Sequence, residues 1–163
     1  MSEFTTVLHE ALQEYAIPNG NGAYFAKVFK GEPSALFPSN GPPICRWATT
    51  GTRVAPEGPR TLRGERMLAA VFGVFVYWPL AATEGAQQSQ EDDISTVMVD
   101  LPATLVGLSD PDALETYTLA GKTVQLVTVE DPTLVERAFP FPSSEVEMRI
   151  LTLEVHARML EAS

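Results

Sequence analysis

The chain has little that would support redox, metal or nucleophilic chemistry. It contains one cysteine, Cys45, and two histidines, His9 and His156, among 163 residues. A single cysteine forms no internal disulfide. Arg46 follows Cys45 and would lower the pKa of the thiol, but the position in a strand pattern indicates a small buried residue. His9 falls on the polar side of a helix pattern and His156 near the chain end, so both indicate surface residues. We therefore predict no catalytic residue and a non-enzymatic protein.

Basic residues are also few. Eleven Lys and Arg stand against 21 Asp and Glu, which gives a formal net charge of −10. Nucleic-acid affinity depends largely on basic side chains that neutralise phosphates, so we expect no tight nucleic-acid binding. Five arginines lie within a short stretch: Arg46, Arg53, Arg60, Arg63 and Arg66. They indicate either a solvated loop with flanking strand ends or a docking surface for an acidic partner, such as another copy of this chain.

No uncharged run is long enough to span a bilayer. The longest covers residues 67–83, whereas a spanning helix needs about 20 apolar residues, and Pro79 stands near its end. The first residues, MSEFTT, have neither a basic segment nor an apolar core typical of a signal peptide. The expectation is a protein made in a cytoplasm, with no membrane association.

Apparent ligand-binding motifs fail on residue type or spacing. "HEALQ" at His9 has Gln13 where a zinc-protease helix needs a second histidine. "AGKT" at residues 120–123 lacks the first glycine of a phosphate-binding loop, because Thr116 stands there. The acidic run at residues 91–93 is better explained as the charged start of a helix, with Ser89 as its cap, than as a metal site. No metal and no cofactor are predicted.

What the chain does have is a strand with two apolar faces, at residues 66–78. Its β-branched and aromatic residues suit a pleated sheet better than a helix. One face carries Leu68, Phe72, Val74, Val76 and Trp78, and the other carries Phe75 and Tyr77 among its members. Both faces should therefore be covered. Helices of the same chain can cover one, and loops together with a neighbouring subunit are the expected cover for the other.

The remaining patterns predict a single α+β domain, residues 1–163. A helix begins the chain, with an apolar stripe of Phe4, Val7, Leu8, Ala11, Leu12 and Tyr15. Strands are expected at residues 23–29, 44–50, 122–130 and 145–158. A second helix is expected at residues 91–108, after a polar loop at 81–90, with a kink or break at Pro102. The result is one mixed or antiparallel sheet of about five strands, two helices on one face, and long loops rich in Pro and Gly.

The segment between the last two strands, residues 131–144, is predicted to be a loop. It contains "AFPFPSS", in which Pro140 and Pro142 hold the chain extended, so Phe139 and Phe141 should project to the same side. These two rings either pack onto the core of the subunit or form a docking arm for a partner.

In order and pattern the chain resembles the tail terminator proteins of long-tailed, non-contractile bacteriophages. The resemblance is carried by four segments: "FTTVLHEALQEY", "MLAAVFGVFVYW", "EDDISTVMVDLPATLVGL" and "EVEMRILTLEVHARML". They cover most of the chain without a diagnostic motif.

The resemblance implies a small subunit that forms a ring, usually a hexamer, on the finished tail tube. Such a ring ends tube polymerisation and joins the filled head, so the expected partners are the tail tube protein and a head-completion or neck protein. The expected location is the head-proximal end of the virion tail, with DNA passing through the ring. The candidate interface residues are Arg53, Arg60, Arg63, Phe75, Tyr77, Phe139 and Phe141. Alternatives are a head–tail neck or tail tube subunit, or a monomeric α+β ligand-binding protein or enzyme.

Overall fold

The structure is a computed structural model, and it describes residues 2–18, 20, 22–31, 43–54, 66–79, 83–108, 125–130, 132–141 and 144–161. Side chains in parts of these strands, among them 51–54, 66–69, 136–141, 144–147 and 158–161, are not described. The described elements follow the chain as α1 (Ser2–Glu14), β1 (Val28–Lys30), β2 (Ile44–Val54), β3 (Arg66–Pro79), α2 (Glu84–Val106), β4 (Gln125–Val129), β5 (Thr133–Phe141) and β6 (Ser144–Glu161).

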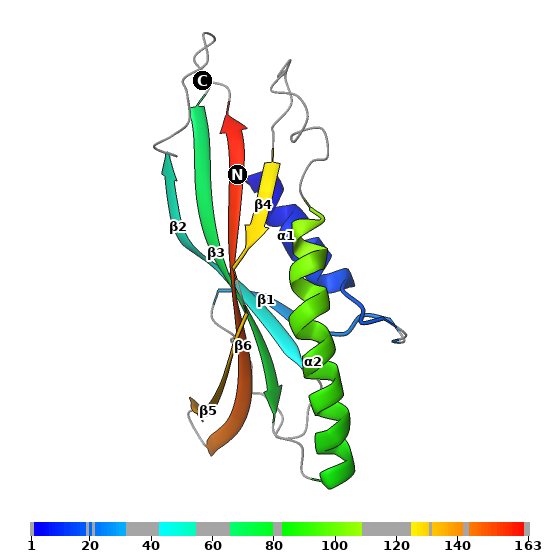
Figure 1. The fold of residues 1–163 in the computed structure, drawn as a ribbon. Coiled ribbons are helices and arrows are strands. Elements are labelled where there is room, and N and C mark those ends of the chain that lie inside the picture. The colour runs from blue at the N-terminus through cyan, green and yellow to red at the C-terminus, as the bar shows by residue number, and fades with distance from the viewer. Residues whose placement is uncertain are drawn as a thin grey trace.

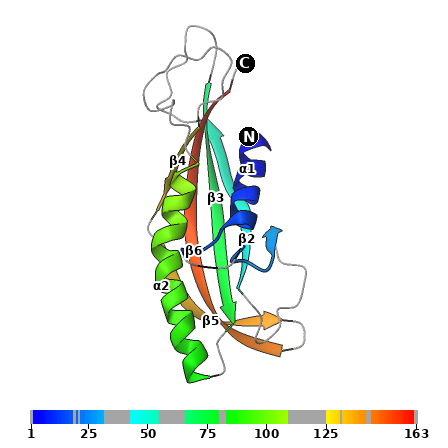
Figure 2. The same ribbon diagram turned by 90° about the vertical axis from the view of Figure 1, so that its right-hand side faces the viewer.

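One mixed sheet holds all the strands, in the order β1-β2-β3-β6-β4, with β5 also paired to β6. Among the described strands, β1 and β2 run parallel, and the other pairs are antiparallel. The sheet is strongly twisted, and α1 and α2 lie on the same side of it (Figures 1 and 2). The predicted α+β fold, with one sheet and two helices on one face, is confirmed.

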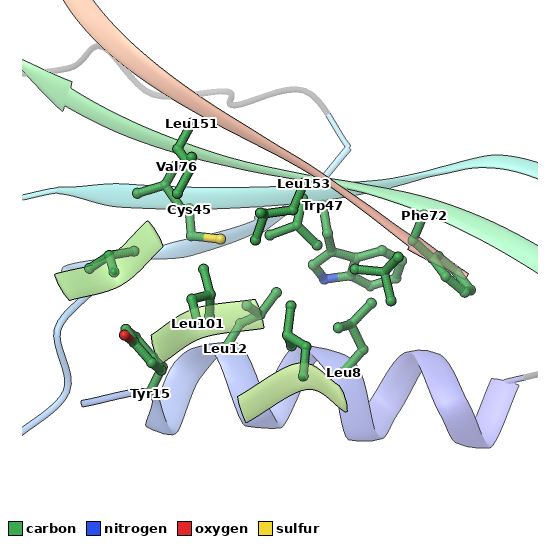
Figure 3. Close-up of a cluster of buried hydrophobic side chains, with 14 of the residues drawn as sticks. Leu8, Leu12, Tyr15, Cys45, Trp47, Phe72, Val76, Leu101, Leu151 and Leu153 are labelled. Atoms are coloured by element: carbon green, nitrogen blue, oxygen red, sulfur yellow. The ribbon is translucent and has the colours of Figure 1, made fainter. Parts of the chain in front are cut away.

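The main core lies between this face and the two helices. Leu8 and Leu12 of α1, Tyr15 directly after α1, and Leu101 of α2 point toward the sheet, as Figure 3 shows. Residues spaced by two on β3 and β6 meet them, as period-2 alternation requires: Ala70, Phe72, Val74, Val76, Trp78, Leu151, Leu153, Val155 and Ala157. The apolar stripes predicted for both helices therefore face the core. Val7, assigned to the α1 stripe, is instead 38% exposed at its margin.

Helix α2 differs from its prediction at both ends. It begins at Glu84, where Thr83 is the N-cap and its hydroxyl accepts a hydrogen bond from the Ala86 N–H at 3.2 Å. The capping roles predicted for Ser89 and the acidic run are therefore wrong, and Glu91 instead forms an ion pair with Arg149 of β6. The helix also continues through Pro102 without a break. Burial of Leu101 and Leu105 on either side of the proline offsets the missing backbone bond.

Strand β5 replaces most of the loop predicted at residues 131–144. It forms a hairpin with β6, in which Phe141 pairs with Ser144. Val129 of β4 pairs with Val155 and Thr133 of β5 with Thr152, so β4 and β5 lie one after the other along the same edge of β6. The strand predicted at residues 23–29 is also shorter, and β1 begins only at Val28.

Among the described residues, no helix is long and apolar enough to cross a membrane.

Candidate functional site

The sheet face turned away from α1 and α2 is the candidate functional surface, and we call it the open face. Of the residues that the structure describes, none forms a helix on it. The strand registers place on it one alternate set from each strand. This set includes Phe29, Ile44, Arg46, Val71, Gly73, Phe75, Tyr77, Met148, Ile150, Thr152, Glu154 and His156.

One end of the open face is apolar and aromatic. Ile44, Tyr77, Met148 and Ile150 are buried there in a second, smaller cluster, and Phe29 and Phe75 pack against it while remaining partly exposed. The register explains this grouping, because Tyr77 of β3 lies between Ile44 of β2 and Ile150 of β6. Tyr77 is only 1% exposed, so it belongs to the fold of the subunit.

Arg46 binds this aromatic end through two contacts. Its Nε donates a hydrogen bond of 2.6 Å to the Tyr77 hydroxyl, and its guanidinium carbon lies 4.0 Å from the centre of the Phe75 ring. The Phe75 ring covers Gly73, where an added Cβ would lie 2.7 Å from the ring. Guanidinium groups stack well on aromatic rings. The Phe75 ring therefore packs between the Arg46 guanidinium on one side and the backbone of Gly73, which has no side chain, on the other. The contact holds a partly exposed aromatic ring at a defined position.

The middle of the open face is polar and acidic. His156 of β6 lies beside Glu154 of the same strand and Glu130, which follows β4. The His156 Nε2 atom is 2.9 Å from a Glu154 carboxylate oxygen and 3.3 Å from one of Glu130. The backbone N–H of Glu130 donates to the Glu154 carbonyl at 3.0 Å, which fixes the two strands side by side at this point.

The structure brings together only some of the predicted interface residues. Phe75 and Tyr77 lie side by side on the open face. Arg53 pairs with Ala69 near the opposite end of β3, about 26 Å from Tyr77 at the usual rise per residue of a strand. Phe139 and Phe141 lie in β5, beyond the Tyr77 end of the sheet, and their side chains are not described. Arg60 and Arg63 fall outside the described residues.

Sequence reasoning missed the partners of these residues. Arg46 entered only as one of five arginines, and Glu130, Glu154 and His156 were not grouped at all. Alternation of Ile44 and Arg46 along β2 would have indicated their common face. The register between β4 and β6, which brings Glu130 to Glu154, leaves no sign in the sequence.

Cys45 and His9 belong to the helix-covered side. Cys45 is fully buried, as predicted, and burial raises the pKa of its thiol far above the usual range, against the smaller opposite effect of Arg46. His9 is only partly exposed, and its Nδ1 accepts a hydrogen bond of 2.9 Å from the Trp47 indole. Burial first, and then Lys30, lowers the pKa of His9. The prediction of a surface histidine was therefore wrong at His9, because the α1 residue next to buried Leu8 reaches Trp47 of the sheet.

No protein-family model matches this chain, and a search of curated proteins finds no match either.

Proposed function

We propose that this protein is a phage tail terminator, a structural subunit that forms a ring on the tail tube, ends its polymerisation and provides the surface for joining the head. The proposal starts from the resemblance in pattern. The observation that carries it is the open face, where Phe75 remains partly exposed beside Arg46 on a sheet layer with both helices on its other side.

The open face favours association because it is only partly satisfied within the subunit. Antiparallel sheets that face water on one side usually carry polar residues there. Here Phe29, Val71 and Phe75 stand partly exposed on that side. Burial of apolar area is worth about 25 cal/mol per Å², so a few hundred Å² per subunit would drive contact with another copy. Closed rotational symmetry satisfies identical patches without open-ended growth.

The charge pattern suits a second copy as the occupant. The chain is strongly acidic overall, while Arg46 places a cation at the apolar end of the open face. An acidic surface of another subunit would complement that cation. An acidic ring also suits a channel through which DNA has to move without binding.

The test is a charge placed at the centre of the candidate interface. Phe75→Glu should fold, because the side chain is partly exposed and the new carboxylate lies beside Arg46, but it should abolish ring formation. Val99→Glu is the matched control, since Val99 of α2 is 76% exposed on the helix side of the molecule. Particle mass by sedimentation, with electron microscopy of the chain alone and mixed with purified tail tubes, measures assembly.

Four results would contradict the proposal. Phe75→Glu could form the same rings as the unmodified chain, which would remove the open face from the interface. The unmodified chain could remain monomeric even with tail tubes present, which would favour a ligand-binding protein or enzyme. Open-ended tubes would instead identify a tail tube subunit, and a ring that binds the head portal but no tube would identify a neck subunit.

A further inference from the structure

We propose that Glu130, Glu154 and His156 form a binding site for one divalent transition-metal ion of the zinc class. The three residues lie in the acidic middle of the open face, and one ligand atom from each lies within 4.8 Å of the others. The site is independent of ring formation, since all three ligands belong to one subunit.

The distances around His156 are close to those of a metal cage. Zinc binds histidine nitrogen at about 2.0–2.1 Å and carboxylate oxygen at about 2.0–2.2 Å, so neighbouring ligands of a tetrahedral ion lie about 3.4 Å apart. The Nε2 atom lies 2.9 and 3.3 Å from the two carboxylate oxygens. A separation smaller by a few tenths of an ångström needs only a small side-chain movement.

The state of the His156 nitrogen is a second and separate observation. The His156 side chain is 31% exposed, but its Nε2 atom has almost no contact with solvent and makes no hydrogen bond of good geometry, although a carboxylate oxygen of Glu154 and one of Glu130 lie at ion-pair distance. Buried polar atoms usually have a partner, and one without a partner requires an explanation. Carboxylate oxygens that surround a nitrogen without accepting its hydrogen bond are arranged as ligands of a common ion would be.

The backbone holds the ligands in place before any ion binds. Glu154 and His156 are two residues apart on β6 and therefore share a face. Glu130, directly after the end of β4, is held beside Glu154 by its backbone hydrogen bond. Both carboxylates remain about half exposed or more, which leaves room for water as a fourth ligand.

The donor set selects the class of metal. One imidazole and two carboxylates suit zinc and its neighbours in the first transition row, whereas magnesium and calcium prefer oxygen ligands alone. Two carboxylates with a neutral imidazole also match the charge of a divalent cation. The lone thiol, Cys45, is buried on the other side of the sheet and does not compete.

Calorimetric titration of the untagged, EDTA-treated full chain with Zn²⁺ tests the site. We expect one ion per chain, no competition from excess Mg²⁺, and binding at least about tenfold weaker in His156→Ala, Glu130→Gln and Glu154→Gln. Glu10→Gln, an exposed α1 residue, should bind as the unmodified chain does. Because the chain has only two histidines, NMR should show the His156 ring signals shifting with Zn²⁺ while those of His9 stay in place.

Co²⁺ gives a further readout, because a four-coordinate site produces strong visible absorption. No saturable Zn²⁺ binding, equal binding by the three ligand variants, or a shift of the His9 signals instead of those of His156 would each overturn the proposal.

Discussion

Alkaline pH should destabilise this protein steeply, starting near pH 9. Cys45 is fully buried and Tyr15 is 3% exposed in the core beneath the helices. Burial raises the pKa of both groups, and for Tyr15 the Asp100 carboxylate, which accepts its hydrogen bond at 2.9 Å, raises the pKa further. The folded state therefore keeps protons that the unfolded chain releases. Their contribution to stability is complete below the unfolded pKa values, about 8.5 for the thiol and 10 for the phenol, and is lost as pH rises toward the folded values.

The size of the lost stability follows from the slope of the free energy of unfolding against pH. Each pH unit above the unfolded pKa costs about 1.4 kcal/mol per group. At pH 11 the free energy of unfolding should be lower by about 3 kcal/mol because of the thiol and by about 1 kcal/mol because of the phenol. The total approaches the lower end of the 5–15 kcal/mol typical of a folded protein, so unfolding is expected near pH 11. Tyr24, whose pKa is raised mainly by burial, acts in the same direction.

Urea unfolding in the presence of reductant, followed by circular dichroism from pH 8 to 11, measures this slope. Cys45→Val removes the titrating thiol with little change in shape, so the free energy of unfolding should become nearly flat between pH 8.5 and 10. Tyr15→Phe should be less stable at pH 8 but should flatten the curve above pH 10. A variant without the thiol that keeps the full slope below pH 10 would refute the reasoning.

Three further predictions concern stability and share the urea assay at pH 8. Thr83→Ala removes the N-cap of α2 and should lower the free energy of unfolding by about 0.5–2 kcal/mol. Ser89→Ala, in the exposed helix interior, should change it by less than about 0.5 kcal/mol. Equal effects of the two substitutions would contradict the cap assignment. Pro102→Ala should gain about 1–3 kcal/mol, and a loss would show that the sheet requires the proline. Tyr77→Phe removes the hydroxyl that accepts the hydrogen bond from Arg46 and should lower the free energy of unfolding by about 1.5–3 kcal/mol. An unchanged urea midpoint would mean that this hydrogen bond contributes no net stability.

Apolar periodicity predicted the parts of the fold that bury a continuous stripe. The core faces of α1 and α2 and the whole of β3 follow from it. The first two turns of α2 carry no such stripe, since they are exposed, and residues 81–90 therefore read as a loop. Their Glu, Ala and Gln content favours a helix by propensity alone. The helix at Pro102 shows the opposite case, in which packing of Leu101 and Leu105 overrides a local penalty.

Strand β5 could not be found by the same reasoning because it lies at a sheet edge. Edge strands tolerate proline and charge, which a central strand excludes, and Pro140, Glu136 and Arg137 all fall within β5. The candidate site has a different difficulty. Phe75 and Tyr77 are visible as one face of one strand, but their contacts with Arg46, and the meeting of Glu130 with His156, depend on strand registers that no local pattern encodes.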